Sequence, residues 1–93
     1  MRTNKVSYKK LERVVKGFAN HRRLQILGLL KRESELSVDE ITEKLNIGYM
    51  NASDHIRKLA IAGLVLKRND GNSVRHKITD RAATILEFCK KLE

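Results

Sequence analysis

The sequence of 93 residues contains no proline and no tryptophan, and its only cysteine is Cys89. A single cysteine cannot form an intramolecular disulfide, which excludes a disulfide-stapled scaffold and favours a reducing compartment. No apolar run approaches the ~20 residues that cross a bilayer, and the start of the chain, MRTNKVSYKK, lacks the apolar stretch of a signal peptide. These absences predict a protein of the cytoplasm without a membrane partner.

The chain also lacks the features that separate domains. It has no internal repeat, no low-complexity run and no linker-like segment, so residues 1–93 are expected to form a single domain. A chain of this length buries only ~60–65% of its unfolded surface on folding, so its stability is expected to depend on a second copy. We therefore predict a homodimer.

Positive charge is abundant but uneven. Lys and Arg number 20 against 11 Asp and Glu, which gives a formal net charge of +9 and a pI near 10.1, and this field attracts polyanions. Residues 1–23 hold eight basic residues and one acid, residues 33–45 five acids and one lysine, and residues 54–81 seven basic residues and three acids. A polyanion is expected to contact the first and third blocks and avoid the second. Solvated helix faces are the alternative explanation.

Apolar residues at three- and four-residue spacing predict helices in the first half of the chain. The first helix is expected over residues 7–19, and Asn20 is expected to cap a second helix that reaches about Lys31. This second helix is apolar on more than one side, so it is expected to be central. Ser37 followed by Glu40 is a capping box, which predicts the start of a third, short helix.

The fourth helix is expected over residues 49–62, after the tight connection NIG. Its inward side is predicted to consist of Ala52, Ile56 and Leu59, and Gly63 is suited to its C-terminal cap.

The pattern changes to period two after the fourth helix. Residues 64–68 and 74–78 alternate and flank a turn that contains the dipeptide DG at 70–71, which predicts a β-hairpin. A last amphipathic helix is expected to be capped by Thr79 or Asp80. The expected fold is therefore mainly α with a small β-hairpin, in the order four helices, hairpin, one helix.

This order predicts a winged helix-turn-helix, with residues 38–62 as the helix-turn-helix and residues 64–78 as the wing. In such a domain the second helix of the motif enters the major groove of DNA. On this helix the residues predicted to contact DNA are Gly48, Tyr49, Met50, Asn51, Ser53, Asp54 and Arg57. On the wing they are Lys67, Arg68, Asn72, Arg75 and Lys77.

The side chains of the fourth helix differ in how well they suit a groove. Asn51 can bond to an adenine edge, Arg57 can reach guanine or a phosphate, and Met50 can touch a thymine methyl group. Asp54 is repelled by phosphates, so it is expected to discriminate against wrong sequences or to pair with Lys58. The backbone N–H groups after Gly48 are expected to receive a phosphate, as helix N-termini do.

Several segments resemble one known family. HRRLQIL, DEITEKLNI, SDHIRKLAIAGLV and the turn at Gly71 make residues 11–92 similar to the ArsR-type winged-helix transcriptional regulators of bacteria and archaea. The resemblance implies a homodimer built from the first and last helices, which binds an inverted repeat upstream of a gene and often releases DNA when an effector binds. A repressor is the predicted role, and the sequence leaves activation open. The apolar residues predicted for this dimer interface are Leu11, Val15, Phe18, Ala82, Ile85, Leu86, Cys89 and Leu92.

The chain departs from the family pattern at the metal sites. Metal-sensing members carry Cys-x-Cys at the start of the third helix, where this chain has Ser37 and Asp39. Members with a site on the last helix use Asp and His, whereas Asp80 is followed here by Arg81 and Ala82. We therefore predict no metal, no cofactor and an unknown effector. The chain also departs from the family on the fourth helix, where Asp54 replaces a basic residue and Gly48 replaces Ser. The DNA sequence that it binds is therefore not expected to follow from the operators of the family.

An enzyme is not expected, because no nucleophile has a positioned base. Ser53, Asp54 and His55 carry the groups of a catalytic triad, but consecutive helical residues point about 100° apart. Two other functions stay open: a winged helix that binds protein or structured RNA, and a DNA architectural protein indifferent to sequence. A redox-sensitive bond between two copies of Cys89 would need a reactive thiol, and nothing in the sequence indicates one.

Overall fold

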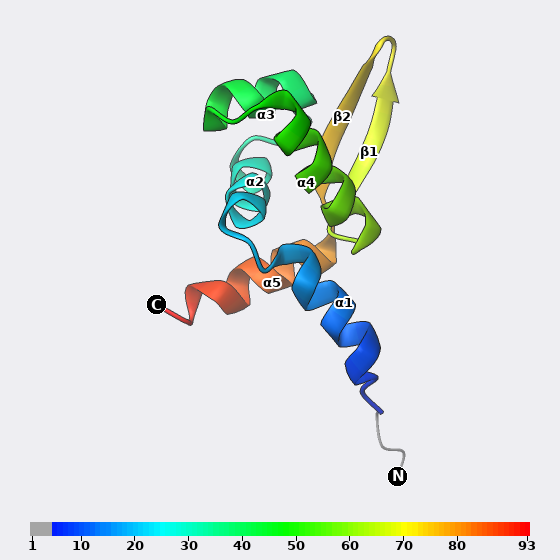
Figure 1. Ribbon diagram of the computed structural model, residues 1–93, viewed down its shortest axis with the longest axis vertical. Helices are drawn as coiled ribbons and strands as arrows, with labels where there is room; N and C mark the ends of the chain where they lie inside the picture. The colour runs from blue at the N-terminus through cyan, green and yellow to red at the C-terminus, as the bar shows by residue number, and fades with distance from the viewer. Residues whose placement is uncertain (1–4) are drawn as a thin grey trace.

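A computed structural model describes residues 5–93 (Figure 1). Residues 1–4, which belong to the predicted domain and to its basic first block, lie outside the described residues. The elements follow one another as α1 (Tyr8–Phe18), α2 (His21–Arg32), α3 (Val38–Leu45), α4 (Tyr49–Ile61), β1 (Val65–Asp70), β2 (Ser73–Ile78) and α5 (Asp80–Lys90). This order confirms the predicted fold class of four helices, a hairpin and one helix.

Side-chain caps explain where four of the helices begin. The side chains of Ser7, Asn20 and Thr79 accept hydrogen bonds from the first turns of α1, α2 and α5. At α3 both halves of the capping box are present, because Ser37 Oγ accepts from the N–H of Glu40 at 3.2 Å and Glu40 Oε1 accepts from the N–H of Ser37 at 2.9 Å. Of the two caps considered for the last helix, Thr79 is the one observed.

The hairpin is longer at its tip than predicted. Strand pairing continues past residues 68 and 74, through Asn69 with Val74 and Asp70 with Ser73, so only Gly71 and Asn72 form the turn. Gly71 has a φ of 63°, the left-handed value that the first central residue of a two-residue hairpin turn requires. Asp70 is therefore the last strand residue rather than part of the turn.

A backbone bridge outside the two strands joins the hairpin to the linker before α3, and the sequence pattern did not reveal it. Leu36, in the linker between α2 and α3, forms an antiparallel bridge with His76. The N–H of His76 donates to the carbonyl of Leu36 at 2.9 Å, and the N–H of Glu35 donates to the carbonyl of His76 at 2.8 Å. These bonds tie the wing to the segment that leads into the helix-turn-helix.

Helix α2 is central, as its apolar composition predicted. It contacts α3, α4, α5 and β2, and four of its residues, Ile26, Leu27, Leu29 and Leu30, are buried. In Figure 1 the helix-turn-helix and the wing occupy one end of the elongated molecule, and α1 and α5 occupy the other. Ala82 on α5 is fully buried within the single chain, so the prediction that it contacts a partner is wrong: the core of the domain already covers it.

Candidate nucleic-acid interface

Helix α4 is mounted on the core by one side and exposed on the other. Ala52, Ile56 and Leu59 are buried as predicted, whereas Met50 is 80% exposed and Tyr49 is 53% exposed. Exposed methionine and tyrosine side chains on a well-packed helix leave apolar surface in water that a ligand can cover. The helix therefore presents a stable face outward.

Asp54 on this exposed face is held by two cations. Its carboxylate accepts from Arg57 Nη2 at 2.6 Å and lies 3.3 Å from Lys58 Nζ. The hydrogen bonds from Arg57 and Lys58 lower the pKa of Asp54. The structure thus contains the predicted pair with Lys58 and adds a pair with Arg57, so the negative charge that opposes a polyanion is neutralised locally.

The start of α4 lacks a side-chain cap. Gly48 is its N-cap residue, and among the described residues 5–93 no side chain accepts from the first N–H groups. A small polar cleft of about 240 Å³ lies beside this end. Its lining consists of Arg22, Asn46, Ile47, Gly48, Asn51 and His55. Free N–H groups beside an arginine suit a phosphate, and that role for Gly48 stays a prediction.

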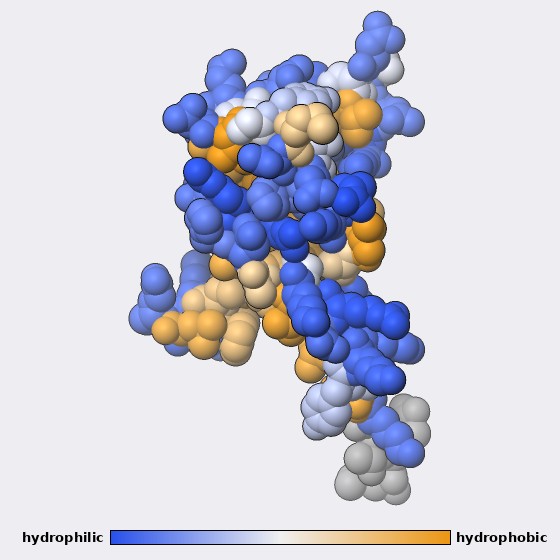
Figure 2. All heavy atoms as spheres, viewed as in Figure 1, coloured by the Kyte–Doolittle hydropathy of each residue, from blue (hydrophilic) through white to orange (hydrophobic). Residues whose placement is uncertain are grey.

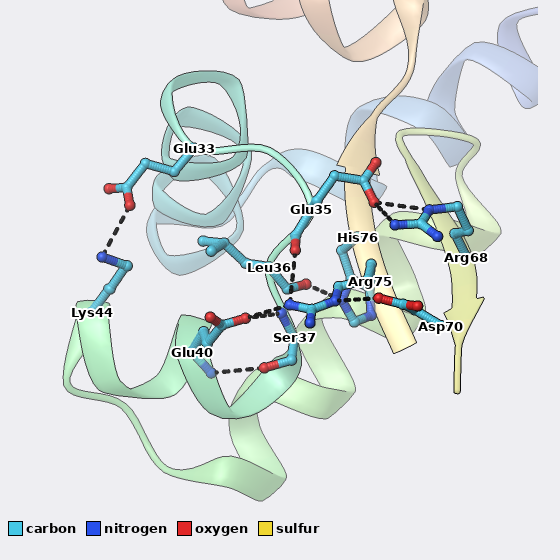
Figure 3. Close-up of polar contacts among 10 residues, drawn as sticks. All are labelled: Glu33, Glu35, Leu36, Ser37, Glu40, Lys44, Arg68, Asp70, Arg75 and His76. Atoms are coloured by element: carbon cyan, nitrogen blue, oxygen red, sulfur yellow. Dashed lines mark hydrogen bonds and ion pairs between the residues drawn. The ribbon is translucent and has the colours of Figure 1, made fainter. Parts of the chain in front are cut away.

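Two of the predicted wing contacts are engaged within the chain (Figure 3). Arg68 donates through Nε and Nη2 to Glu35 Oε1 at 3.0 and 2.8 Å. Arg75 reaches Glu40 at 3.1 Å, Asp70 at 3.4 Å and the backbone carbonyl of Glu35 at 3.4 Å. Because Arg68 and Arg75 face each other across the strands, these carboxylates also relieve repulsion between like charges. Both arginines therefore fasten the wing to the α2–α3 linker and α3.

The other predicted wing residues are differently placed. Lys67, Asn72 and Lys77 are exposed, and within residues 5–93 their side chains make no ion pair or hydrogen bond. Their charge and donors are available to a ligand. The acidic block was predicted to lie away from a polyanion; two of its members, Glu35 and Glu40, instead neutralise the arginines of the wing.

Two histidines hold structural positions in the domain. His76 is 1% exposed, and its Nδ1 donates to the carbonyl of Leu36 at 2.8 Å, which fixes the proton on that nitrogen. His55 Nδ1 accepts from Arg23 Nε at 3.2 Å. Burial lowers the pKa of both imidazoles. Within residues 5–93 no three His, Cys, Asp or Glu residues gather in a group that could hold a metal.

Apolar surface at the opposite end bears on self-association. Leu11, Val15 and Leu92 are exposed, whereas Phe18, Ile85 and Leu86 are half-buried against the core and Cys89 is half-buried. Phe88, which the predicted stripe omitted, is 56% exposed; its spacing of four from Leu92 was the available signal. An open cleft of about 550 Å³ between α1 and α5 includes Leu11 and Ile85.

No helix among residues 5–93 has the length and apolar character to span a membrane.

A short helix, a tight turn, a second helix with an exposed face and a hairpin packed beside it define a winged helix-turn-helix domain. The model of the family described as bacterial regulatory protein, arsR family, matches residues 20–67. The chain belongs to this family. Because it is a family of regulatory proteins, the expectation that the chain is not an enzyme is confirmed.

Similar proteins agree with this assignment. The transcriptional activator HlyU of Vibrio cholerae is 36% identical over 66 residues, and the match covers 71% of this chain and 60% of that protein. The structure of HlyU from Vibrio cholerae superposes with a TM-score of 0.79 and 31% identity over 91% of this chain and 92% of that one. The homodimeric winged helix-turn-helix DNA-binding domain of Mb0332 from Mycobacterium bovis has a TM-score of 0.83 and 28% identity, over 99% and 89% of the two chains.

Proposed function

We propose that this protein is a transcriptional regulator that binds double-stranded DNA in a sequence-specific manner as a homodimer. The exposed face of α4 carries this proposal. Buried Ala52, Ile56 and Leu59 fix the helix on the domain, and exposed Met50 is left on its outer side. A helix of this kind in a winged helix-turn-helix is placed in the major groove, and the hairpin beside it meets the sugar-phosphate backbone.

The homodimer is supported by the apolar surface at the end formed by α1 and α5. Exposed Leu11, Val15, Phe88 and Leu92 leave more large apolar side chains in water there than a monomer of this size needs. Mb0332, a structural relative, is described as homodimeric. Two copies of α4 related by a two-fold axis would read an inverted repeat, with half-site centres about 10–10.5 base pairs apart or a multiple of that.

The direction of regulation is proposed to be repression. The described domain offers surfaces for DNA and for self-association, and a dimer that occupies a promoter through these surfaces would exclude other proteins from the same DNA. HlyU is described as an activator, so the sign needs its own test. Transcription in vitro from a promoter that contains the bound sequence should fall when the protein is added, and a rise would contradict repression. The protein is proposed to act in the cytoplasm and without a metal.

The function is tested by selection from a randomised duplex pool at near-physiological salt, with bound and unbound DNA sequenced. Enrichment of an inverted repeat with one-turn half-site spacing is the expected result. Binding without enrichment would support an architectural protein instead. No binding would favour the module that contacts protein or RNA, and it would contradict the proposal.

A further inference from the structure

A second basic surface lies where α1 meets α4. Gly17 permits this contact, because a Cβ at that position would lie 2.5 Å from the Cβ of Ala62. Beside the contact is an open cleft of about 540 Å³. Its walls are formed by Arg13, Lys16, Gly17, Arg23, Lys58, Ile61 and Ala62. Four of these seven residues are cations and none is an acid, so the cleft is suited to an anion.

Three of the four cations of the cleft, Arg13, Lys16 and Lys58, have at most one weak partner within residues 5–93. Lys16 pairs with Glu12 at 2.9 Å and Lys58 with Asp54 at 3.3 Å. The side chains of both pairs are exposed, each by at least 44%. Exposed pairs of this kind are worth about 0.2–1 kcal/mol, so a phosphate can take the place of the carboxylate. Within residues 5–93, Arg13 makes no ion pair or side-chain hydrogen bond.

Arg23 has a different task in the same cleft. Its Nη1 donates to the carbonyls of Lys16 and Gly17 at 3.2 and 3.3 Å, and its Nε donates to His55. Arg23 thereby holds the end of α1 against α2 and α4. The position of Arg13 and Lys16 relative to α4 is fixed by these bonds and by the close approach at Gly17.

The cleft continues the exposed face of α4. Met50, Asp54, Lys58 and Ile61 recur at spacings of four, four and three, so they form one stripe along the helix, and Ile61 is 74% exposed. From Asn51 to Lys58 the helix rises about 10 Å, a length equal to about three base-pair steps of 3.4 Å along the DNA axis. In Figure 2 hydrophilic and apolar residues lie next to one another over the region where α4 and α1 meet.

We propose that this cleft binds the sugar-phosphate backbone of the DNA duplex next to the groove that α4 enters, with Arg13 and Lys16 of α1 as phosphate contacts. The proposal rests on the DNA-binding function stated above. It gives α1 a role at the DNA in addition to its role in self-association. Phosphate contacts position a protein without reading sequence, so the effect should be the same on every duplex.

The test compares the full-length wild type with the double variant Arg13→Ala/Lys16→Ala. Affinity is measured at several salt concentrations for the selected duplex and for an unrelated duplex. The double variant should reduce the slope of log affinity against log salt by about 2, because each phosphate contact contributes about 0.9. It should weaken both duplexes by the same factor, roughly tenfold.

Lys31→Ala/Arg32→Ala is the matched control, because it removes the same charge from another exposed surface and, like the test pair, includes one lysine in an exposed ion pair, here with Glu87. Equal loss of slope in test and control variants would contradict the proposal, since it would show an effect of net charge alone. Wild-type binding with an unchanged slope in the test variant would overturn the cleft assignment and leave the DNA-binding function intact. If the wild type bound no duplex, the proposed function and this site would both fail.

Discussion

Helix α4 and the wing are both proposed to meet DNA, but they hold their polar groups in different ways. On α4 the charged groups pair with one another along the exposed face, as Asp54 does with Arg57 and Lys58, and apolar packing mounts the helix. On the wing, Arg68 and Arg75 pair with Glu35 and Glu40 from another part of the chain, so charged groups help to hold the wing, together with the backbone bridge between Leu36 and His76. A basic residue on the proposed DNA-binding surface is therefore not necessarily a residue that contacts DNA.

Loss of the apolar packing that holds α4 on the domain gives the largest expected effect on stability. Replacing Ile56, which is 1% exposed, by alanine should lower the free energy of unfolding by about 2–5 kcal/mol through lost burial and a cavity. Ile61→Ala removes the same atoms from an exposed position on the same helix and should change the free energy of unfolding by less than about 0.5 kcal/mol. Urea unfolding of both variants measures the difference, and similar losses would show that α4 is not seated as described.

The ion pairs that hold the wing should contribute less to stability than the packing of α4. Arg75→Ala removes pairs with Glu40 and Asp70 and should lower the free energy of unfolding by about 1 kcal/mol, with little change in the salt dependence of DNA binding. Lys77→Ala, on the same face of β2, should leave stability unchanged and reduce the salt slope by about 1. If Lys77→Ala lowered stability and Arg75→Ala reduced the salt slope, the assignment of Arg75 to holding the wing and of Lys77 to contacting DNA would be contradicted.

Acid should loosen the wing through His76. Burial lowers the pKa of this imidazole, so below the ordinary histidine pKa of about 6.5 the unfolded chain binds a proton that the folded chain does not. Stability is therefore fully present above that pH and falls as the pH drops toward the folded pKa. His55 contributes with the same sign, because burial lowers its pKa too.

Urea unfolding at pH 7.5 and pH 5.5 measures this effect, in a window above the ordinary carboxylate titrations. His76→Gln should reduce the pH dependence, and His21→Gln, at an exposed position, is the control. An unchanged pH dependence in His76→Gln would show that another group carries the loss of stability.

Asp54 gives the smallest expected effect on stability. Asp54→Asn removes exposed pairs and should change the free energy of unfolding by less than about 1 kcal/mol. It should strengthen binding to every duplex, because Arg57 and Lys58 lose their internal partner. Gel-shift titration with related and unrelated duplexes measures this; unchanged affinity would mean that DNA already displaces the pairs without loss.

Local patterns predicted most of the fold. The capping box at Ser37, the cap at Asn20 and the inward stripe of α4 depend on residues a few positions apart, which a sequence displays directly. The bridge between Leu36 and His76 joins residues 40 positions apart, and no local pattern reports it. The same reason explains the arginines of the wing, since their partner Glu35 lies 33 positions from Arg68.

The candidate site was predictable at the level of elements and less so at the level of side chains. Period-two alternation separates His76 from Arg75 and Lys77 on the two faces of β2, but it does not show that only Arg75 has acidic partners. The predicted dimer interface wrongly included Ala82. An apolar stripe in a sequence does not show which of its residues are already buried in the core of the same chain.

The central claim is that the exposed face of α4 reads DNA sequence. The most direct measurement is the ratio of affinities for the selected duplex and a scrambled duplex, in the wild type and in Asn51→Ala. Loss of a bidentate base contact should lower this ratio about tenfold or more, with the affinity for scrambled DNA unchanged. An unchanged ratio in Asn51→Ala, and likewise in Met50→Ala and Arg57→Ala, would contradict the claim that this helix is the reading surface.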